Sequence, residues 1–379
     1  MAKLGELYKI TSGGTPSRNH SEYFENGTIP WVKTGDLKDK YLFETDEKIS
    51  QLGLENSSAR IYLKNTVLLA MYGATIGATS ILEIDAATNQ ACAAFSPRED
   101  VLPEYLYAFL ESQKDKFIKD AVGGAQPNLS AGYLKNIDFD YPPLEQQTKI
   151  TNTLNKIDEL LLLRKQQLAK LDELVKARFV EMFGESEYPC NSLISLIIEG
   201  AGLSYGIVQP GDDGTGDMGV LRPVDFADGK IKTDSIKYID RSLGDGFKKT
   251  ELNGNELLIT VRGTTGITAL TDSRFKGMNV TRGIAVIRYD KKKVDPIYLN
   301  EYIKMEKSQQ YIKEHTRGAT LQQINLSELR DLEIVIPPLP LQRVFATFVE
   351  RVDQQKQTVQ QSLEKLELLK KALMQEYFG

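Results

Sequence analysis

The stretch that decides the fold is YPPLEQQTKITNTLNKIDELLLLRKQQLAKLDELVKARFVEMFG, residues 141–184. It aligns without a gap to IPPLPLQRVFATFVERVDQQKQTVQQSLEKLELLKKALMQEYFG, residues 336–379, and 15 of the 44 positions are identical. Identity at this level over a fixed offset indicates that the chain contains an internal duplication.

Each copy of this stretch predicts one long helix. A Pro-Pro pair opens it, and proline costs little in a first helical turn because its φ is already helical and its missing N–H would have no partner there. A Phe-Gly pair closes it at Gly184 and Gly379, which predicts a left-handed glycine cap. About 40 residues at roughly 1.5 Å each give about 60 Å of helix.

The apolar pattern of both helices predicts a coiled coil. Steps of four and three residues from Ile150 and from Phe345 meet apolar residues at eight of ten positions in each copy, as in an a/d seam. The seam residues that we expect to pair or to bind a partner are Ile150, Leu154, Ile157, Leu161, Leu168, Leu171, Val349, Val352, Val359, Leu363, Leu366 and Leu373.

Polar residues interrupt the seam at different places in the two copies. They are Arg164 and Arg178 in the first copy, and Lys356 and Lys370 in the second. Such differences favour pairing between the two copies over self-pairing of two chains. The alternative is that these side chains lie at an exposed edge of the seam.

Fainter similarity extends upstream of both helices. Residues 65–73 (NTVLLAMYG) match 255–263 (NELLITVRG), and 128–130 (NLS) recurs at 325–327. Short β-like runs at 66–71, 91–95, 257–261 and 284–288 alternate with turn residues, while 103–119 and 296–314 show helical spacing. We therefore predict an α+β chain with domains at 1–140 and 185–335 and long helices at 141–184 and 336–379.

Composition sets limits on the compartment and on the partners. The chain has 379 residues, no apolar run near 18 residues, no signal-peptide pattern and two distant cysteines, Cys92 and Cys190. These features favour a cytoplasmic protein with no membrane span, in which each cysteine is a buried free thiol.

Net charge argues against strong DNA binding by the chain alone, because phosphate contacts require clustered Lys and Arg. The whole chain has a net charge of −5. Residues 220–293 carry 15 Lys/Arg and 9 Asp/Glu, whereas residues 1–140 carry 14 and 19. We expect the chain to bind DNA poorly by itself and a basic partner to supply the remaining attraction.

The order of several short motifs resembles the specificity (S, HsdS) subunits of type I restriction–modification systems. The motifs are ITSGGTP at 10–16, IPWVKTGDL at 29–37, YGATIG at 72–77, AQPNLS at 125–130, IDFDYPPLEQQ at 137–147, YGIVQPG at 205–211 and IVIPPLPLQ at 334–342. Together they cover nearly the whole chain, and their order is more specific than any one of them.

This resemblance implies an architecture and a set of partners. Two target recognition domains, 1–140 and 185–335, would each read one half of a bipartite, interrupted site in double-stranded DNA. The two long helices would pack antiparallel with pseudo-two-fold symmetry, set the spacing between the half-sites and dock two methyltransferase (M) subunits. Restriction (R) subunits would join the full complex. The chain would hold no catalytic residues, cofactor or metal of its own.

Base recognition requires side chains that match base edges, such as Arg or Lys for guanine and Asn or Gln for adenine. The strongest candidate is the loop Arg262-Gly-Thr-Thr-Gly266, whose glycines allow close backbone approach. The alternative is that the glycines only shape turns, at Gly73, Gly77, Gly263 and Gly266. The DNA-binding candidates are Lys33, Thr34, Tyr72, Thr75, Gln126, Asn128, Arg222, Arg262, Thr264, Thr265, Arg317, Gln322 and Gln323.

Asp36 and Asp225 occupy equivalent places in the two domains, and we predict capping or turn-forming roles for both.

Two other functions compete with this interpretation. A DNA-modifying enzyme is disfavoured because DYPPL at 140–144 only superficially resembles an adenine methyltransferase motif, no Walker loop occurs, and His20 and His315 are the only histidines. A structural coiled-coil adaptor without DNA specificity explains the helices, but it does not explain two large, divergent domains.

Overall fold

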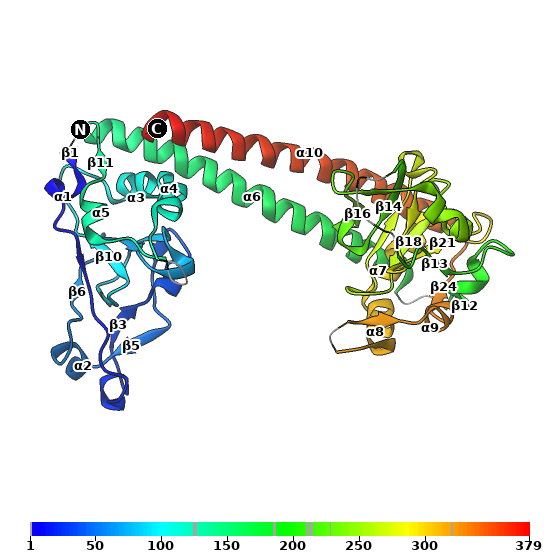
Figure 1. Ribbon diagram of the computed structural model, residues 1–379, viewed down its shortest axis with the longest axis horizontal. Coiled ribbons are helices and arrows are strands. Elements are labelled where there is room, and N and C mark those ends of the chain that lie inside the picture. The colour runs from blue at the N-terminus through cyan, green and yellow to red at the C-terminus, as the bar shows by residue number, and fades with distance from the viewer. Residues whose placement is uncertain are drawn as a thin grey trace. The chain divides into compact units, whose positions relative to one another are not determined.

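The computed structural model describes residues 2–379 apart from 124–126, 185–186, 210, 212–213, 215, 228 and 320. The chain divides into two compact units (Figure 1). Unit 1 combines Met1–Lys165 with Gln361–Gly379, and unit 2 is Gln166–Gln360. Each unit therefore contains one globular domain and one segment of each long helix, which confirms the predicted α+β class with long helices.

Unit 1 is built on two sheets. The larger has the strand order β2-β10-β7-β8-β4, and the smaller has the order β5-β3-β9-β6. Strands β7, β8 and β10 are buried along their whole length, and α3 packs against β7 and β8. The strands are β2 (Thr11–Ser12), β3 (Ile29–Val32), β4 (Tyr41–Leu42), β5 (Glu47–Ile49), β6 (Ile61–Tyr62), β7 (Val67–Ala70), β8 (Thr79–Leu82), β9 (Ala86–Thr88) and β10 (Cys92–Phe95). The helices are α1 (Leu4–Leu7), α2 (Gln51–Glu55), α3 (Pro103–Ser112), α4 (Lys114–Asp120) and α5 (Ala131–Lys135), and β1 (Ala2–Lys3) pairs with β11 (Asp138–Phe139).

Unit 2 repeats this plan with one strand fewer in each of its two main sheets. Its larger sheet has the order β13-β21-β18-β19, and a second sheet has the order β17-β14-β20. These strands are β13 (Ser204–Tyr205), β14 (Met218–Leu221), β17 (Lys237–Ile239), β18 (Leu257–Thr260), β19 (Thr268–Leu270), β20 (Asn279–Val280) and β21 (Ile284–Ile287). The strand pairs β12 (Cys190–Ser192) with β24 (Glu333–Val335), β15 (Phe226–Ala227) with β16 (Lys230–Ile231), and β22 (Thr316–Arg317) with β23 (Gln323–Ile324) complete it.

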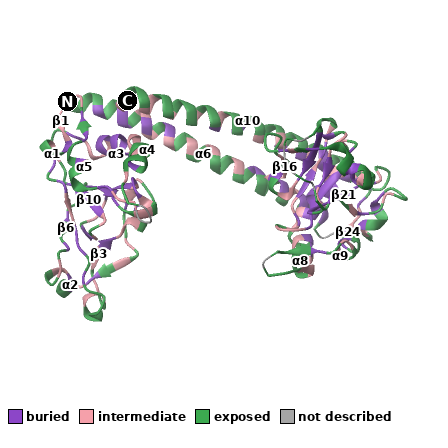
Figure 2. Cartoon of the chain, viewed as in Figure 1, coloured by how far each residue is buried: buried purple, intermediate pink, exposed green. Residues whose placement is uncertain are grey.

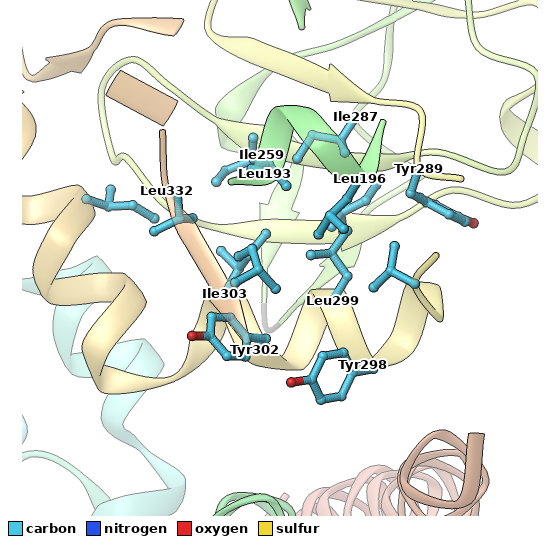
Figure 3. Close-up of a cluster of buried hydrophobic side chains, with 14 of the residues drawn as sticks. Leu193, Leu196, Ile259, Ile287, Tyr289, Tyr298, Leu299, Tyr302, Ile303 and Leu332 are labelled. Atoms are coloured by element: carbon cyan, nitrogen blue, oxygen red, sulfur yellow. The ribbon is translucent and has the colours of Figure 1, made fainter. Parts of the chain in front are cut away.

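The core of unit 2 forms where a helix covers the larger sheet. Figure 3 shows Tyr298, Leu299 and Ile303 of α7 (Pro296–Lys304) in one cluster with Ile259 and Ile287 of the sheet. All of these side chains are fully or almost fully buried. Burial of this apolar area is the main stabilising contribution to the domain.

The helical spans expected at 103–119 and 296–314 are each broken into two helices. In unit 1 the break falls at Gln113, between α3 and α4. In unit 2 it falls at Met305, whose extended backbone separates α7 from α8 (Glu306–His315). The Gln309 side chain then donates to the Ile303 carbonyl (2.7 Å), which satisfies an acceptor near the break.

The long helices are α6 (Leu144–Phe183) and α10 (Leu339–Phe378), so each Pro-Pro pair precedes its helix. A buried glutamine fixes each start in the same way. Gln147 donates to the Pro142 carbonyl and accepts from the Leu102 backbone N–H. In the second copy, Gln342 donates to the Pro337 carbonyl and accepts from the Asp295 N–H.

The predicted left-handed glycine cap is wrong for both helices, because neither Gly184 nor Gly379 has a φ in the left-handed region. Gly184 N donates to Val180 O at 2.8 Å, and Gly379 N donates to Gln375 O at 2.9 Å. Each glycine thus continues the i→i−4 hydrogen-bond pattern, which needs no left-handed turn.

The stepped seam positions are buried or half-buried in both helices (Figure 2). Lys356 and Lys370 lie on this seam and form ion pairs with α6: Lys356 with Asp172 at 2.6 Å in unit 2, and Lys370 with Asp158 at 2.5 Å in unit 1. For these two lysines, pairing between the copies is the interpretation that holds. In unit 2 the ring centroids of Phe183 and Phe345 also lie 5.6 Å apart. Phe183 follows Asp172 in α6, whereas Phe345 precedes Lys356 in α10, so these two contacts show that the two helix segments run antiparallel there.

The Asp172–Lys356 pair gives a first testable prediction. Asp172→Lys places two cations together and should lower the free energy of unfolding by about 1 kcal/mol or less, because the carboxylate is largely exposed. The double variant Asp172→Lys/Lys356→Asp should recover most of that loss in urea unfolding. Glu173→Lys, at the exposed neighbouring position, is the matched control. A coupling energy of zero between the two substitutions would show that the pair is not formed in solution.

Two further sequence predictions have clear outcomes. Cys92 is fully buried, and burial raises the pKa of its thiol to about 12. Cys190 is an exposed free thiol, so the prediction that it is buried is wrong; it lies on β12, which forms a two-stranded sheet with β24 and whose residues are exposed or half-buried. Among the described residues, no helix is both long and apolar enough to cross a bilayer.

Candidate nucleic-acid interface

A glycine-framed loop leaves the central strand of the larger sheet in unit 1. Gly73 (φ 68°) and Gly77 (φ 82°) have left-handed φ values, and Gly77 N donates back to Ala70 O at 3.0 Å. Glycine adopts these conformations at no steric cost because it has no Cβ atom. The loop after β7 is therefore a tight turn that projects its tip beyond the sheet.

A second segment of unit 1 lies against this loop. Gly73 N donates to Pro127 O, and Leu129 N donates to Met71 O, both at 2.9 Å. These bonds form an isolated antiparallel bridge between Tyr72 and Asn128. Two candidates that are 56 positions apart in the sequence are thus neighbours, and we call them the unit 1 bridged pair.

The same backbone arrangement recurs in unit 2. Gly263 (φ 83°) and Gly266 (φ 87°) frame the loop, and Gly266 N donates to Thr260 O at 2.9 Å. Gly263 N donates to Gln322 O at 2.8 Å, and an antiparallel bridge joins Arg262 to Gln323, the unit 2 bridged pair. The glycines do shape turns, and the turns bring predicted candidates together.

A cavity of about 400 Å³ opens beside the unit 2 bridged pair. Three polar side chains that the sequence prediction missed help to line it: Tyr205, Arg282 and Asn325. In the part of unit 2 that the structure describes, the side chains of Arg262, Arg282 and Gln323 have no hydrogen-bond or ion-pair partner. The cavity thus presents two free guanidinium groups and carboxamide groups to solvent.

Four other candidates of unit 2 lie on the glycine-framed loop and on or beside the β22–β23 pair, outside the set of residues that line this cavity. Thr265 lies within hydrogen-bond distance of Thr316 (3.0 Å between the hydroxyl oxygens), which ties the glycine-framed loop to the β22–β23 pair. Arg317 is highly exposed and lies 3.6 Å from a Glu328 carboxylate oxygen. Thr264 and Gln322 are exposed at the loop tips.

Lys33 and Arg222 lie in a pair of equivalent turns, one in each unit, in which hydrogen bonds hold the backbone. Each begins a short 3-10 turn, and each backbone N–H donates to an aspartate three residues later: Lys33 to Asp36 and Arg222 to Asp225, both at 2.7 Å. The capping role predicted for the two aspartates is therefore confirmed. Thr34 lies within the first of these turns and is half-buried.

Both basic side chains in these turns are engaged inside their units. The Arg222 guanidinium donates to Asp225 and to the Ser235 carbonyl. Lys33 pairs with Glu47 at 2.6 Å, and this hydrogen bond holds the pKa of the Glu47 carboxyl below its ordinary value. Burial raises the pKa of Asp36 despite its backbone hydrogen bond. These contacts favour a role in shaping the turns.

Two unit 1 candidates remain. Thr75 donates to the Tyr72 carbonyl within the loop at 3.2 Å. Gln126 lies outside the described residues, so its role as a DNA-binding residue stays a prediction. Arg60, which the sequence prediction also missed, lines a cavity of about 260 Å³ with Thr11, Ser12 and Met71.

Comparison with known proteins places this architecture in a family. The model for the type I restriction modification DNA specificity domain matches residues 1–173 and 215–368. The MjaIX specificity subunit of Methanocaldococcus jannaschii is 26% identical over 385 residues, covering 92% of this chain and 85% of that protein. The EcoR124I/EcoR124II specificity subunit of Escherichia coli is 26% identical over 162 residues, 41% of this chain and 40% of that one.

Solved structures show the same fold. A chain from a study of type I restriction–modification complex assembly covers all of this chain with a TM-score of 0.66 at 17% identity, and 96% of that chain is covered. The S subunit from M. genitalium gives a TM-score of 0.57 at 14% identity, with 95% of it covered. With the family model matching most of the sequence on both sides of the duplication, the chain belongs to the type I restriction–modification specificity subunit family.

Proposed function

We propose that this chain reads a bipartite, interrupted DNA sequence for a type I restriction–modification complex. Residues 1–140 and 185–335 act as the two target recognition domains, one for each half-site. The observation that carries this proposal is the pair of glycine-framed loops, which share backbone hydrogen bonds but differ in side chains. A common framework with different contact residues is what two readers of two different half-sites require.

The long helices at 141–184 and 336–379 act as the spacer between the half-sites and as the docking region for two M subunits. The seam residues pack inside each unit, so the M subunits use other faces of the helices. Exposed apolar side chains are present there, and the largest exposures on the helices belong to Leu162, Leu163, Val180, Val344 and Leu368. Apolar side chains left in water are typical of a surface that a partner covers.

Catalysis belongs to the partners in this proposal. The chain supplies sequence selection, the M subunits transfer the methyl group, and R subunits join for cleavage, all in the cytoplasm. The methyltransferase-like stretch DYPPL at 140–144 has a structural role that supports this view. It forms the entrance to α6, where the Pro142 carbonyl accepts from Gln147 and the Asp140 carbonyl accepts from Tyr105.

Methylome sequencing of a host that carries this chain with its cognate M subunits tests the proposal. We expect one interrupted motif with two non-identical halves to be methylated, and a host with the M subunits alone to lack it. Methylation that is absent from every interrupted motif would contradict the proposal. A structural adaptor would instead leave the M subunits with the same sequence preference whether or not the chain is present.

A further inference from the structure

The two bridged pairs place different side chains on one shared backbone. Tyr72 opposes Asn128 in unit 1, and Arg262 opposes Gln323 in unit 2. Directly opposed residues of an antiparallel bridge project to the same face, with their Cβ atoms roughly 4.5–5.5 Å apart. Each bridge therefore presents two neighbouring side chains as one contact element.

Both pairs point away from the core of their domain. Their sequence neighbours Met71 and Leu129 are buried in unit 1, as are Val261 and Ile324 in unit 2. Side chains alternate between the two faces of an extended backbone, so the residue next to a buried one faces outward. The glycine-framed turns hold this orientation, because their conformation is closed by backbone hydrogen bonds that do not involve the variable side chains.

The spacing and chemistry of each pair suit the edge of one or two adjacent base pairs. An arginine fork binds guanine O6 and N7, a glutamine or asparagine amide binds adenine N6 and N7, and an aromatic ring can contact the thymine methyl group. Arg262 and Gln323 have no competing partner among the described residues of unit 2, so neither needs to break an internal bond in order to bind a base.

Building on the proposed DNA-reading function, the geometry points to the bridged pair as the specificity-determining element of each domain. In unit 2, Arg262 reads a guanine and Gln323 reads an adjacent adenine. In unit 1, Asn128 reads an adenine and Tyr72 covers the neighbouring thymine, with no guanidinium in the pair. The two half-sites therefore differ at this position: the unit 2 half-site contains a G·C pair there, and the unit 1 half-site contains only A·T pairs.

The test uses the complete complex of this chain with its M subunits, by methylome mapping and by binding to duplexes with each base pair exchanged in turn. Arg262→Gln should convert one position of the unit 2 half-site from G to A, or reduce discrimination at that position by about 5- to 150-fold. All other positions, including the whole unit 1 half-site, should stay unchanged. Arg274→Gln, an exposed arginine of the same unit that pairs with Asp272, is the control and should leave the motif intact.

Gln323→Ala is the second variant, and it should relax discrimination only at the adjacent position. Gln323 is exposed, so its truncation should leave the stability of the chain unchanged. If Arg262→Gln lowers the melting temperature of the chain, Gln323→Ala therefore tests the assignment in its place. A motif that both variants leave unaltered overturns the assignment while the proposed function stands. Uniformly weaker binding to all duplexes, with a reduced salt dependence, overturns it as well, since Arg262 would then contact phosphate. A wild-type complex with no interrupted motif instead removes the proposed function.

Discussion

A chain with one extra heptad in each long helix, after Arg164 and after Val359, should direct methylation to the same two half-sites across a longer spacer. Seven residues add about 10.5 Å of helix at about 1.5 Å each. They also preserve the 3.5-residue seam, so the apolar positions on either side stay in register. B-DNA rises about 34–36 Å per 10–10.5 base pairs, so the spacer should lengthen by up to about 3 base pairs.

Both insertion points lie next to the boundaries between the compact units, which fall after Lys165 and after Gln360. The extra residues therefore leave the domain cores and the bridged pairs untouched. A chain with only one of the two insertions is the control, because it shifts the seam of one helix against the other and should lose methylation. Methylome sequencing measures both results. An unchanged spacer in the double insertion would contradict the ruler role of the helices.

Phe345→Ala should be among the most destabilising single substitutions in unit 2. Phe345 is fully buried, and its ring lies 5.5 Å from that of Phe179, 5.6 Å from that of Phe183 and 6.4 Å from that of Tyr298. Removing it leaves a cavity among rings that cannot collapse easily, and the cost should be about 3–5 kcal/mol. That is a large share of a typical domain stability of about 5–15 kcal/mol.

The chain contains a built-in probe for this experiment. Its single tryptophan, Trp31, is buried in unit 1, so its fluorescence reports that unit, whereas circular dichroism reports both. In urea, Phe345→Ala should lower the denaturant concentration at which circular dichroism shows unit 2 to unfold. The midpoint of the unfolding transition that Trp31 fluorescence reports for unit 1 should stay unchanged. Val344→Ala, at the neighbouring and mostly exposed position, should change stability by about 0.5 kcal/mol or less. Equal shifts of both signals would show that the two units unfold together.

The helices and central strands were predictable because their information is local. The heptad pattern gave both long helices to within a few residues, and the apolar runs at 66–71 and 257–261 contain β7 and β18. The broken spans at Gln113 and Met305 were missed, since helical spacing continues across a single non-helical residue. The cap at Gly184 failed for a related reason, because a glycine permits a left-handed conformation but does not require it.

The candidate site was only partly predictable because it depends on pairing between distant segments. The motif YGATIG indicated the loop at Tyr72, and the glycine spacing with an arginine indicated the loop at Arg262, but nothing in the sequence indicates that Arg282 and Tyr205 line the same cavity as Arg262. Their approach depends on the pairing of β13 with β21 and on the parallel bridge between Ile207 and Thr281. Conversely, Arg222 has a suitable residue type, yet its fork is occupied by Asp225.

The division of the chain into units has a consequence for biosynthesis. Unit 1 includes Gln361–Gly379, and Leu373, Met374, Tyr377 and Phe378 pack against the core that the first domain forms. The ribosome makes this segment only after all of unit 2. The first domain therefore receives its last core residues after the second domain has been synthesised. Until then the apolar surface that Phe378 covers, beside Tyr105 and Phe109, is open to chaperones and proteases. A nascent chain interrupted between the two units therefore leaves an unfinished first domain, which is a natural substrate for quality control.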